Sequence, residues 1–163
     1  MARALLVGCG CHARELGRAL LADGWAVRGT TRRESTRAAI EAAGIESAIA
    51  DPDRVGTVLD HVGDVAVVAW LLGSASGTAD EVEAVNRLRL ESLLGKLVDT
   101  PVRGFVFEAA GTADPEVLGA GAELVEQAAR TWMIPVRVVR AERGSDGAWA
   151  AAMGAAVAGV LSG

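Results

Sequence analysis

Three side chains that enzymes commonly use for proton transfer are scarce in this sequence. The 163 residues include no tyrosine and two histidines, and Lys96 is the only lysine among 16 basic residues. Any mechanism that requires a tyrosine acid or a second lysine is therefore excluded. Cysteine is also scarce, and Cys9 and Cys11 lie too close in sequence to link distant parts of a fold.

Charge and hydropathy exclude further classes of protein. The net charge of -5 argues against a nucleic-acid surface, because such surfaces depend on clustered positive charge. The hydrophobic fraction of 51% argues against a disordered chain, and no stretch reaches the roughly 20 apolar residues of a membrane helix. The first residues lack the features of a secretory signal. We therefore expect one cytoplasmic domain over residues 1–163, with no membrane or nucleic-acid partner.

Short apolar runs alternate with segments of helical periodicity. This pattern predicts an α/β fold: a doubly wound, six-stranded and mainly parallel Rossmann sheet with helices on both faces. The expected strands are Ala4 to Val7, Ala26 to Thr30, Ser47 to Ala50, Val65 to Ala69, Gly104 to Phe107 and Val136 to Val139. The expected helices are Arg14 to Asp23, Glu34 to Ala43, Pro52 to Val62, Ala79 to Val98 and Glu116 to Trp132.

A further helix is expected over residues 146–161, which are apolar on nearly every side. A helix of this kind needs cover. It is either buried against the sheet or part of a homodimer contact, and the sequence leaves both alternatives open.

The first expected strand leads into a glycine-rich turn. Residues Gly8, Gly10 and Ala13 fit the pattern G-x-G-x-x-G/A, with Cys11 and His12 between them. In this pattern the glycines permit a tight turn and a close approach of pyrophosphate, which then meets the positive end of the next helix. These five residues are therefore candidates for binding a dinucleotide. The alternative is a glycine turn in a doubly wound protein that binds no nucleotide.

The end of the second expected strand favours NADP(H) over NAD(H). An NAD site places an acidic residue there to hold the ribose hydroxyls, but this chain has Thr30, Thr31, Arg32 and Arg33. Hydroxyl and guanidinium groups can bind a 2'-phosphate that a carboxylate would repel. The alternative is that both arginines begin a solvated helix. Asp51, after the third strand, is a candidate to face adenine or to cap the next helix.

Cys9, Cys11 and His12 are residue types that bind zinc, but their spacing does not support a metal site. The C-x-C-H order differs from the C-x-x-C spacing of zinc sites, and the other histidine, His61, lies on a different expected helix. We predict no metal and interpret the cysteines as small fillers around the turn.

Beyond these motifs, the whole chain resembles the extended and atypical short-chain dehydrogenase/reductases, which include sugar-nucleotide epimerases and NmrA-like proteins. Asn86 matches the asparagine of the family's fourth helix, and residues 105–107 match its aromatic fifth strand. The resemblance continues through ELVEQAARTWMIPVRVVR, residues 123–140. It implies a bound NAD(P). We add Ala69 and Trp70 to the cofactor-binding candidates, although Trp70 is more simply a core or interface anchor.

The chain departs from this family at its catalytic residues. Ala109 and Ala110 stand at the position of the family's serine, and Val117 and Gly121 are the best matches to its tyrosine and lysine. The usual carbonyl reduction therefore cannot run through these groups. Carboxylates near the fifth strand offer an unusual acid or base, although loop carboxylates are more often solvated; they are Glu108, Asp114 and Glu116.

Three functional hypotheses remain. The first is an NADP(H)-binding protein without standard catalysis, acting as a nucleotide-binding or redox-responsive module. The second is a small NADPH-dependent oxidoreductase whose acid is unconventional or comes from a partner, since the hydride chemistry belongs to the cofactor. The third is an interaction protein that keeps the scaffold and binds no nucleotide.

Overall fold

Six parallel strands form one sheet in the computed structural model, which describes residues 1–162. The strand order is β3-β2-β1-β4-β5-β6. The chain adds β2 and β3 on one side of β1 and then crosses over to add β4, β5 and β6 on the other side, so the strand order reverses between β1 and β4. The predicted doubly wound α/β fold is confirmed. The strands are β1 (Arg3–Val7), β2 (Ala26–Thr31), β3 (Glu46–Ile49), β4 (Val67–Trp70), β5 (Gly104–Glu108) and β6 (Val136–Val139).

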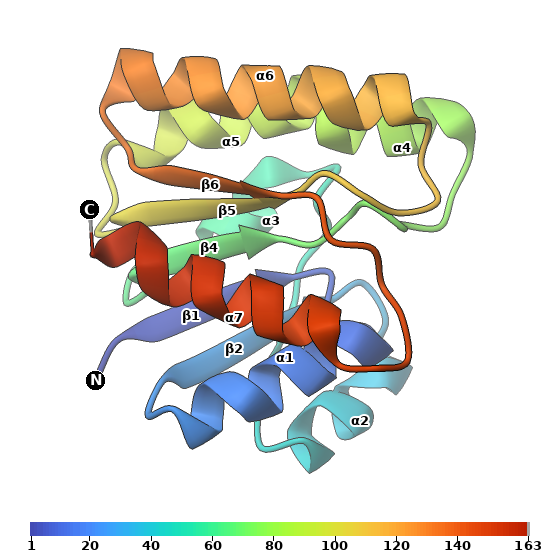
Figure 1. Cartoon of the computed structure of the whole chain (residues 1–163), viewed down its shortest axis with the longest axis vertical. Coiled ribbons are helices and arrows are strands. Elements are labelled where there is room, and N and C mark those ends of the chain that lie inside the picture. The colour runs from blue at the N-terminus through green and yellow to red at the C-terminus, as the bar shows by residue number, and fades with distance from the viewer. Residues whose placement is uncertain (163) are drawn as a thin grey trace.

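Helices cover both faces of the sheet (Figure 1). One face carries α1 (Cys11–Ala22), α2 (Arg37–Ala42) and α7 (Ala148–Leu161). The other face carries α3 (Val55–Leu59), α4 (Ala79–Asn86), α5 (Leu88–Leu97) and α6 (Pro115–Trp132). A short 3-10 helix, Glu34–Thr36, precedes α2. None of the helices within residues 1–162 is long and apolar enough to cross a membrane.

Strand β1 shows why the sequence forms a sheet covered on both sides. Leu5 and Val7 pack into the core beneath α3 to α6, whereas Ala4 and Leu6 pack into the core beneath α1, α2 and α7. All four side chains are fully buried. Neighbouring residues of a strand point to opposite faces, so a continuous apolar run is what a central parallel strand requires.

Some expected helices differ from the structure, and the one expected over Glu34 to Ala43 is divided into the 3-10 helix and α2. The single helix expected over residues 79–98 breaks at Arg87, whose φ of -134° and ψ of -90° are not helical. Just before the break, the Asn86 amide donates to Val82 O at 3.0 Å. The third helix is also shorter than expected, because Asp51 O accepts from Arg54 N at 2.8 Å in a turn and α3 starts only at Val55. The expectation that Asp51 caps this helix was wrong.

Helix α7 is buried on one side against the sheet and α1. Its inward side chains include Trp149, Met153 and Val157, whereas the exposed side carries Ala151 and Ala155. The first alternative for residues 146–161, burial against the sheet, is therefore what the structure has. The homodimer contact stays a prediction.

Candidate functional site

A cavity of about 320 Å³ opens at the carboxyl ends of β1 to β4. Its walls come from the turn after β1, the ends of β2 and β3, the loop after β4, one side of α4, and Arg143. The carboxyl edge at a reversal of strand order is where open α/β sheets bind their ligands. The cavity therefore lies where the fold places a binding site.

The glycine-rich turn forms one wall of the cavity. Gly8 has a φ of +93°, and a Cβ there would meet Leu71 O at 2.8 Å, so the predicted tight turn requires glycine. Gly10 is the N-cap of α1, has no side chain to cap the helix, and has no atom within 4 Å of its absent Cβ. The first N–H groups of α1 therefore have no side-chain cap, and the space above Gly10 is open.

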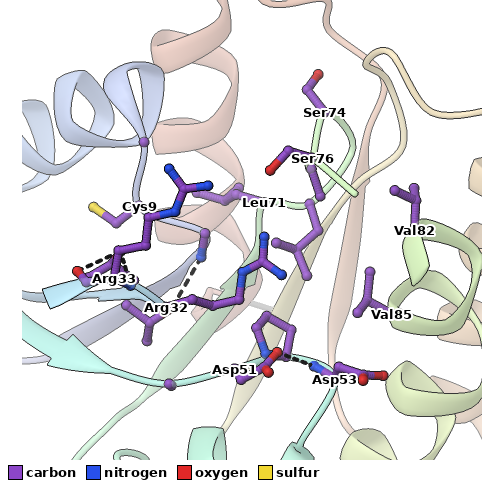
Figure 2. Close-up of a pocket in the computed structure, with 18 of the residues that line it drawn as sticks. Cys9, Arg32, Arg33, Asp51, Asp53, Leu71, Ser74, Ser76, Val82 and Val85 are labelled. Atoms are coloured by element: carbon purple, nitrogen blue, oxygen red, sulfur yellow. Dashed lines mark hydrogen bonds between the residues drawn. The ribbon is translucent and has the colours of Figure 1, made fainter. Parts of the chain in front are cut away.

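The end of β2 brings the predicted phosphate-binding side chains to the cavity. Thr30 is buried, and its Oγ1 accepts from Gly8 N at 3.2 Å, which ties β2 to the turn. Thr31 Oγ1 accepts from Arg33 N at 3.1 Å and fixes the direction of the chain. Arg32 and Arg33 are exposed, and their guanidinium groups make no ion pair within residues 1–162. Figure 2 shows the Arg32 guanidinium in the space between Leu71 and Asp51.

The carboxylates around the cavity have partners of their own. Asp51 accepts from Asp53 N at 3.0 Å, and Asp53 pairs with Arg89 at 3.0 Å. Glu81 completes a capping box with Thr78 at the start of α4. The guanidinium groups of Arg32 and Arg33 are thus not neutralised by these acids.

The opposite side of the cavity is apolar. Val82 and Val85 of α4 face it (Figure 2). Leu72, from the loop after β4, also lines this side. Trp70 holds this part of α4 in place, because its Nε1 donates to Val85 O at 3.1 Å. The cavity therefore has the cationic side chains of Arg32 and Arg33 on one side and apolar side chains of α4 on the other.

Three residues of the glycine-rich motif do not line the cavity. Cys11 is exposed, and Ala13 is buried on the inward side of α1. His12 turns toward the loop before α7, where its Nε2 lies 3.3 Å from Gly144 O and its ring meets Trp149 edge to face. Of the side chains of these three residues, only that of Cys11 is exposed, and it does not line the cavity.

Ala69 and Trp70 also lie outside the cavity. Both are fully buried, and the Trp70 ring packs against Phe105 with centroids 6.3 Å apart. Stacking of Trp70 on a ligand has no support in this geometry, which matches the simpler interpretation of a core anchor. The residues that the sequence predicted and the structure brings together at the cavity are Gly8, Gly10, Thr30, Thr31, Arg32, Arg33 and Asp51.

Cys9 fills space beneath the turn, as predicted, but Cys11 is exposed, so the interpretation of Cys11 as a filler was wrong. A Cβ on Gly29 would lie 2.5 Å from the Cys9 Sγ, so a larger residue at this position of β2 would displace the thiol. Burial raises the pKa of the Cys9 thiol to about 11, with a smaller opposing effect from the Arg14 charge. Near neutral pH this thiol is protonated and unreactive. Residues 1–162 contain no cluster of three or more histidine, cysteine or acidic side chains placed to hold a metal.

The sequence did not indicate the ion pair beside the cavity. Glu108 is fully buried at the end of β5, and its two oxygens accept from Arg143 Nε at 2.9 Å and Nη2 at 3.0 Å. Gly73 N and Trp149 Nε1 donate to the same carboxylate, at 3.0 and 2.9 Å. Glu108 is thus not the solvated loop carboxylate that we considered. A lone acid within the apolar GFVFE strand was the available signal, but its partner is 35 residues away in sequence.

The sequence resemblance matches Gly121 to the family's lysine and Val117 to its tyrosine, and this match stays a prediction. A Cβ on Gly121 would meet Phe107 Cζ at 2.7 Å and Asn86 O at 2.9 Å. Even alanine is too large at this position without movement of the packing. The Val117 side chain offers no proton donor.

No protein-family model matches the sequence, and neither does any curated protein. Solved structures do match in fold. A short-chain dehydrogenase/reductase superfamily protein from Agrobacterium tumefaciens with bound NAD aligns with a TM-score of 0.69 and 22% identity, over 85% of this chain and 48% of that one. A putative epimerase from Burkholderia cenocepacia aligns with a TM-score of 0.68 and 20% identity, over 90% and 57% of the two chains.

A third structure, UDP-glucuronic acid 4-epimerase from Bacillus cereus in complex with NAD, aligns with a TM-score of 0.67 and 14% identity. The alignment covers 86% of this chain and 56% of the epimerase chain. This chain shares the fold of these dehydrogenases and epimerases. It spans about half of the length of each of them.

Proposed function

We propose that this chain binds a nicotinamide adenine dinucleotide, prefers NADP(H) to NAD(H), and acts as a nucleotide-binding module without standard short-chain reductase catalysis. The observation that carries the proposal is the pair of exposed guanidinium groups, Arg32 and Arg33, at the end of β2. They stand beside a glycine-rich turn at the reversal of strand order. Two of the three solved structures of this fold described above hold NAD, which supports a dinucleotide in general.

The residues of the cavity fit the phosphate and adenosine parts of such a ligand. The uncapped N–H groups of α1 can donate to the pyrophosphate, and the open space above Gly10 lets it approach the backbone. Val82 and Val85 offer an apolar face to adenine. These contacts are common to NAD and NADP.

Preference for NADP(H) follows from the charges beside the ribose position. Arg32 and Arg33 can bind a 2'-phosphate through charge-assisted hydrogen bonds. Asp53 pairs with Arg89, and neither Arg32 nor Arg33 pairs with an acid within residues 1–162. A 2'-phosphate thus finds two cations without ion-pair partners within residues 1–162.

The absence of standard catalysis rests on the family's catalytic positions. The serine position holds Ala109 and Ala110, and the tyrosine position holds Val117. At the lysine position, Gly121 packs too closely against Phe107 to carry a side chain. Nicotinamide supplies hydride chemistry when bound, but these residues offer no group that protonates a carbonyl oxygen.

Calorimetric titration of the purified chain with NADPH and NADH tests the proposal. We expect NADPH to bind at least about tenfold more tightly, the effect of one or two charge-assisted hydrogen bonds. Arg32→Asp with Arg33→Asp removes this preference, because the carboxylates repel the 2'-phosphate. Arg18→Asp, on the exposed side of α1, is the matched charge control and leaves it unchanged. Absence of binding by either nucleotide at about millimolar concentration contradicts the proposal.

The reductase alternative is tested separately. NADPH oxidation is followed with a panel of quinones, aldehydes and flavins. Under our proposal the rate equals that of buffer for every acceptor. Turnover above that background, lost in the Arg32→Asp variant, favours the oxidoreductase.

A further inference from the structure

The cavity is lined mainly by the segments that follow β1, β2, β3 and β4. In a doubly wound sheet of this strand order, each half provides one mononucleotide-binding unit, and a dinucleotide lies across both. Here the walls come from the ends of β1, β2 and β3 and from the loop and helix after β4. None of the residues from 86 to 142 in the sequence lines the cavity. The end of β5 and the loop after it thus contribute no wall, and the loop after β6 contributes only Arg143.

The loops after β4 and β5 are joined directly, so the space between them is closed. Ala113 N donates to Gly73 O at 3.0 Å, and Thr112 N donates to Ser74 Oγ at 3.2 Å. A Cβ on Gly73 would collide with Ala110 O, and a Cβ on Gly111 would collide with Gly73 O. Backbone lies against backbone here, and even a methyl group has no room. A planar ring cannot enter between the two loops without separating them.

Buried side chains close the space on the other side of Gly73. Glu108 accepts from Gly73 N, from Arg143 and from Trp149 Nε1, so all three surround one carboxylate. The Arg143 guanidinium also donates to Leu71 O at 3.2 Å and lies 4.9 Å from the centre of the Trp149 ring. Arg143 is thereby fixed as the end wall of the cavity, beside the first residue after β4.

We propose that the site takes only the adenosine diphosphate half of the dinucleotide, in its 2'-phosphorylated form, and that the nicotinamide half stays in solvent. This inference rests on the function proposed above. Its ligand class is the 2'-phosphorylated adenosine diphosphates, whatever their second half. The protein then distinguishes the phosphorylation of the adenosine ribose, through Arg32 and Arg33, and does not distinguish oxidised from reduced nicotinamide.

Calorimetry with four ligands tests this inference. They are NADP⁺, NADPH, 2'-phospho-ADP-ribose, which lacks nicotinamide, and nicotinamide mononucleotide, which lacks adenosine. We expect the first three to bind within about threefold of one another, and the mononucleotide to show no binding at about 100 times their Kd. Arg32→Asp weakens the first three by the same factor, because it acts on the phosphate that they share.

The possible failures of the two proposals can be told apart. If NADP⁺ or NADPH binds more than about tenfold more tightly than 2'-phospho-ADP-ribose, nicotinamide is bound and this inference is wrong, while the proposed function stands. If none of the phosphorylated ligands binds, the proposed function fails and the inference fails with it. Fluorescence gives a second measurement: on saturation with protein, NADPH keeps the nicotinamide emission that it has in water, whereas an enclosed ring changes it.

Discussion

Arg143 holds both carboxylate oxygens of Glu108, from Nε at 2.9 Å and from Nη2 at 3.0 Å. The carboxylate has no exposed surface, and 19% of the Arg143 side chain is exposed. A buried charge that loses its partner costs far more than an exposed one, because water cannot replace the lost contact. The pair therefore affects the stability of the fold as well as the shape of the cavity.

We expect Arg143→Ala to lower the free energy of unfolding by about 3–5 kcal/mol, measured by urea denaturation. The double variant Glu108→Gln with Arg143→Met recovers more than half of this loss, because it leaves no unpaired charge. Arg87→Ala is the control, since its pair with Glu83 is exposed and is worth about 0.5 kcal/mol. Equal losses for Arg143→Ala and Arg87→Ala would show that the buried pair is not needed.

Gly10→Ala separates binding from folding. The Gly10 φ of -84° suits alanine and its absent Cβ meets no atom within 4 Å, so the free energy of unfolding falls by about 1 kcal/mol at most, the cost of alanine at an N-cap. The new methyl group occupies the space through which pyrophosphate approaches α1. Calorimetry should show binding of NADPH weakened at least about tenfold. Gly119→Ala, on α6, is the control and leaves binding unchanged; equal binding by Gly10→Ala and the unmodified chain contradicts the assignment.

Gly121→Ala tests the packing at the family's lysine position. The added Cβ would meet Phe107 Cζ at 2.7 Å, so we expect a loss of about 1–3 kcal/mol in the free energy of unfolding. Gly119→Ala, two residues earlier on α6, meets no atom and should raise stability by up to about 1 kcal/mol. Thermal denaturation of both variants decides the matter. A stabilised Gly121→Ala variant would mean that this position has room for a side chain.

The two cysteines should differ in reactivity. Cys9 is buried with its pKa raised to about 11, whereas Cys11 is exposed. A thiol reagent at pH 8 should modify one cysteine of the folded chain and both in denaturant, because the thiolate is the reactive form. Cys11→Ser abolishes labelling of the folded chain. Labelling of that variant at the rate of a free thiol would show that Cys9 is accessible.

Asp64 should make stability depend on pH in acid. Hydrogen bonds from Arg28, the shortest of them 2.7 Å, hold the pKa of Asp64 at about 2, below its ordinary value of 3.8. A lowered carboxyl pKa contributes stability that is present above the unfolded pKa and is lost as pH falls through the folded one. Asp64→Asn should therefore be less stable than the unmodified chain at pH 7, by about 1 kcal/mol or less because 49% of the Asp64 side chain is exposed to solvent. The difference should close between about pH 4 and pH 2; a difference that is constant over that range argues against the ion pair.

Local features of the sequence predicted most of the fold. Each strand is a short apolar run next to a helix of clear periodicity, and Gly8 is needed by a turn whose geometry is set within a few residues. The arginines after β2 were also found, because their place follows from the strand that precedes them. Such predictions depend on neighbours in sequence.

The features that sequence reasoning missed depend on neighbours in space. Glu108 and Arg143 meet only because β5 lies beside the loop after β6. The break at Arg87 is not marked by glycine or proline, and Asn86 O lies in close contact with Gly121 on another helix. Trp70 Nε1 reaches Val85 O only because α4 packs beside the end of β4. Composition and periodicity do not contain these contacts.

The packing of α7 against α1 joins the last helix of the described chain to the first. Leu16 and Leu20, on the inward side of α1, belong to the same buried cluster as Met153 and Val157. Because α1 is made before α7, the part of this apolar surface that α7 covers stays uncovered until α7 has been made. Contacts between segments so distant in sequence also form slowly. The glycine-rich turn leads directly into α1, so its full support also depends on this contact.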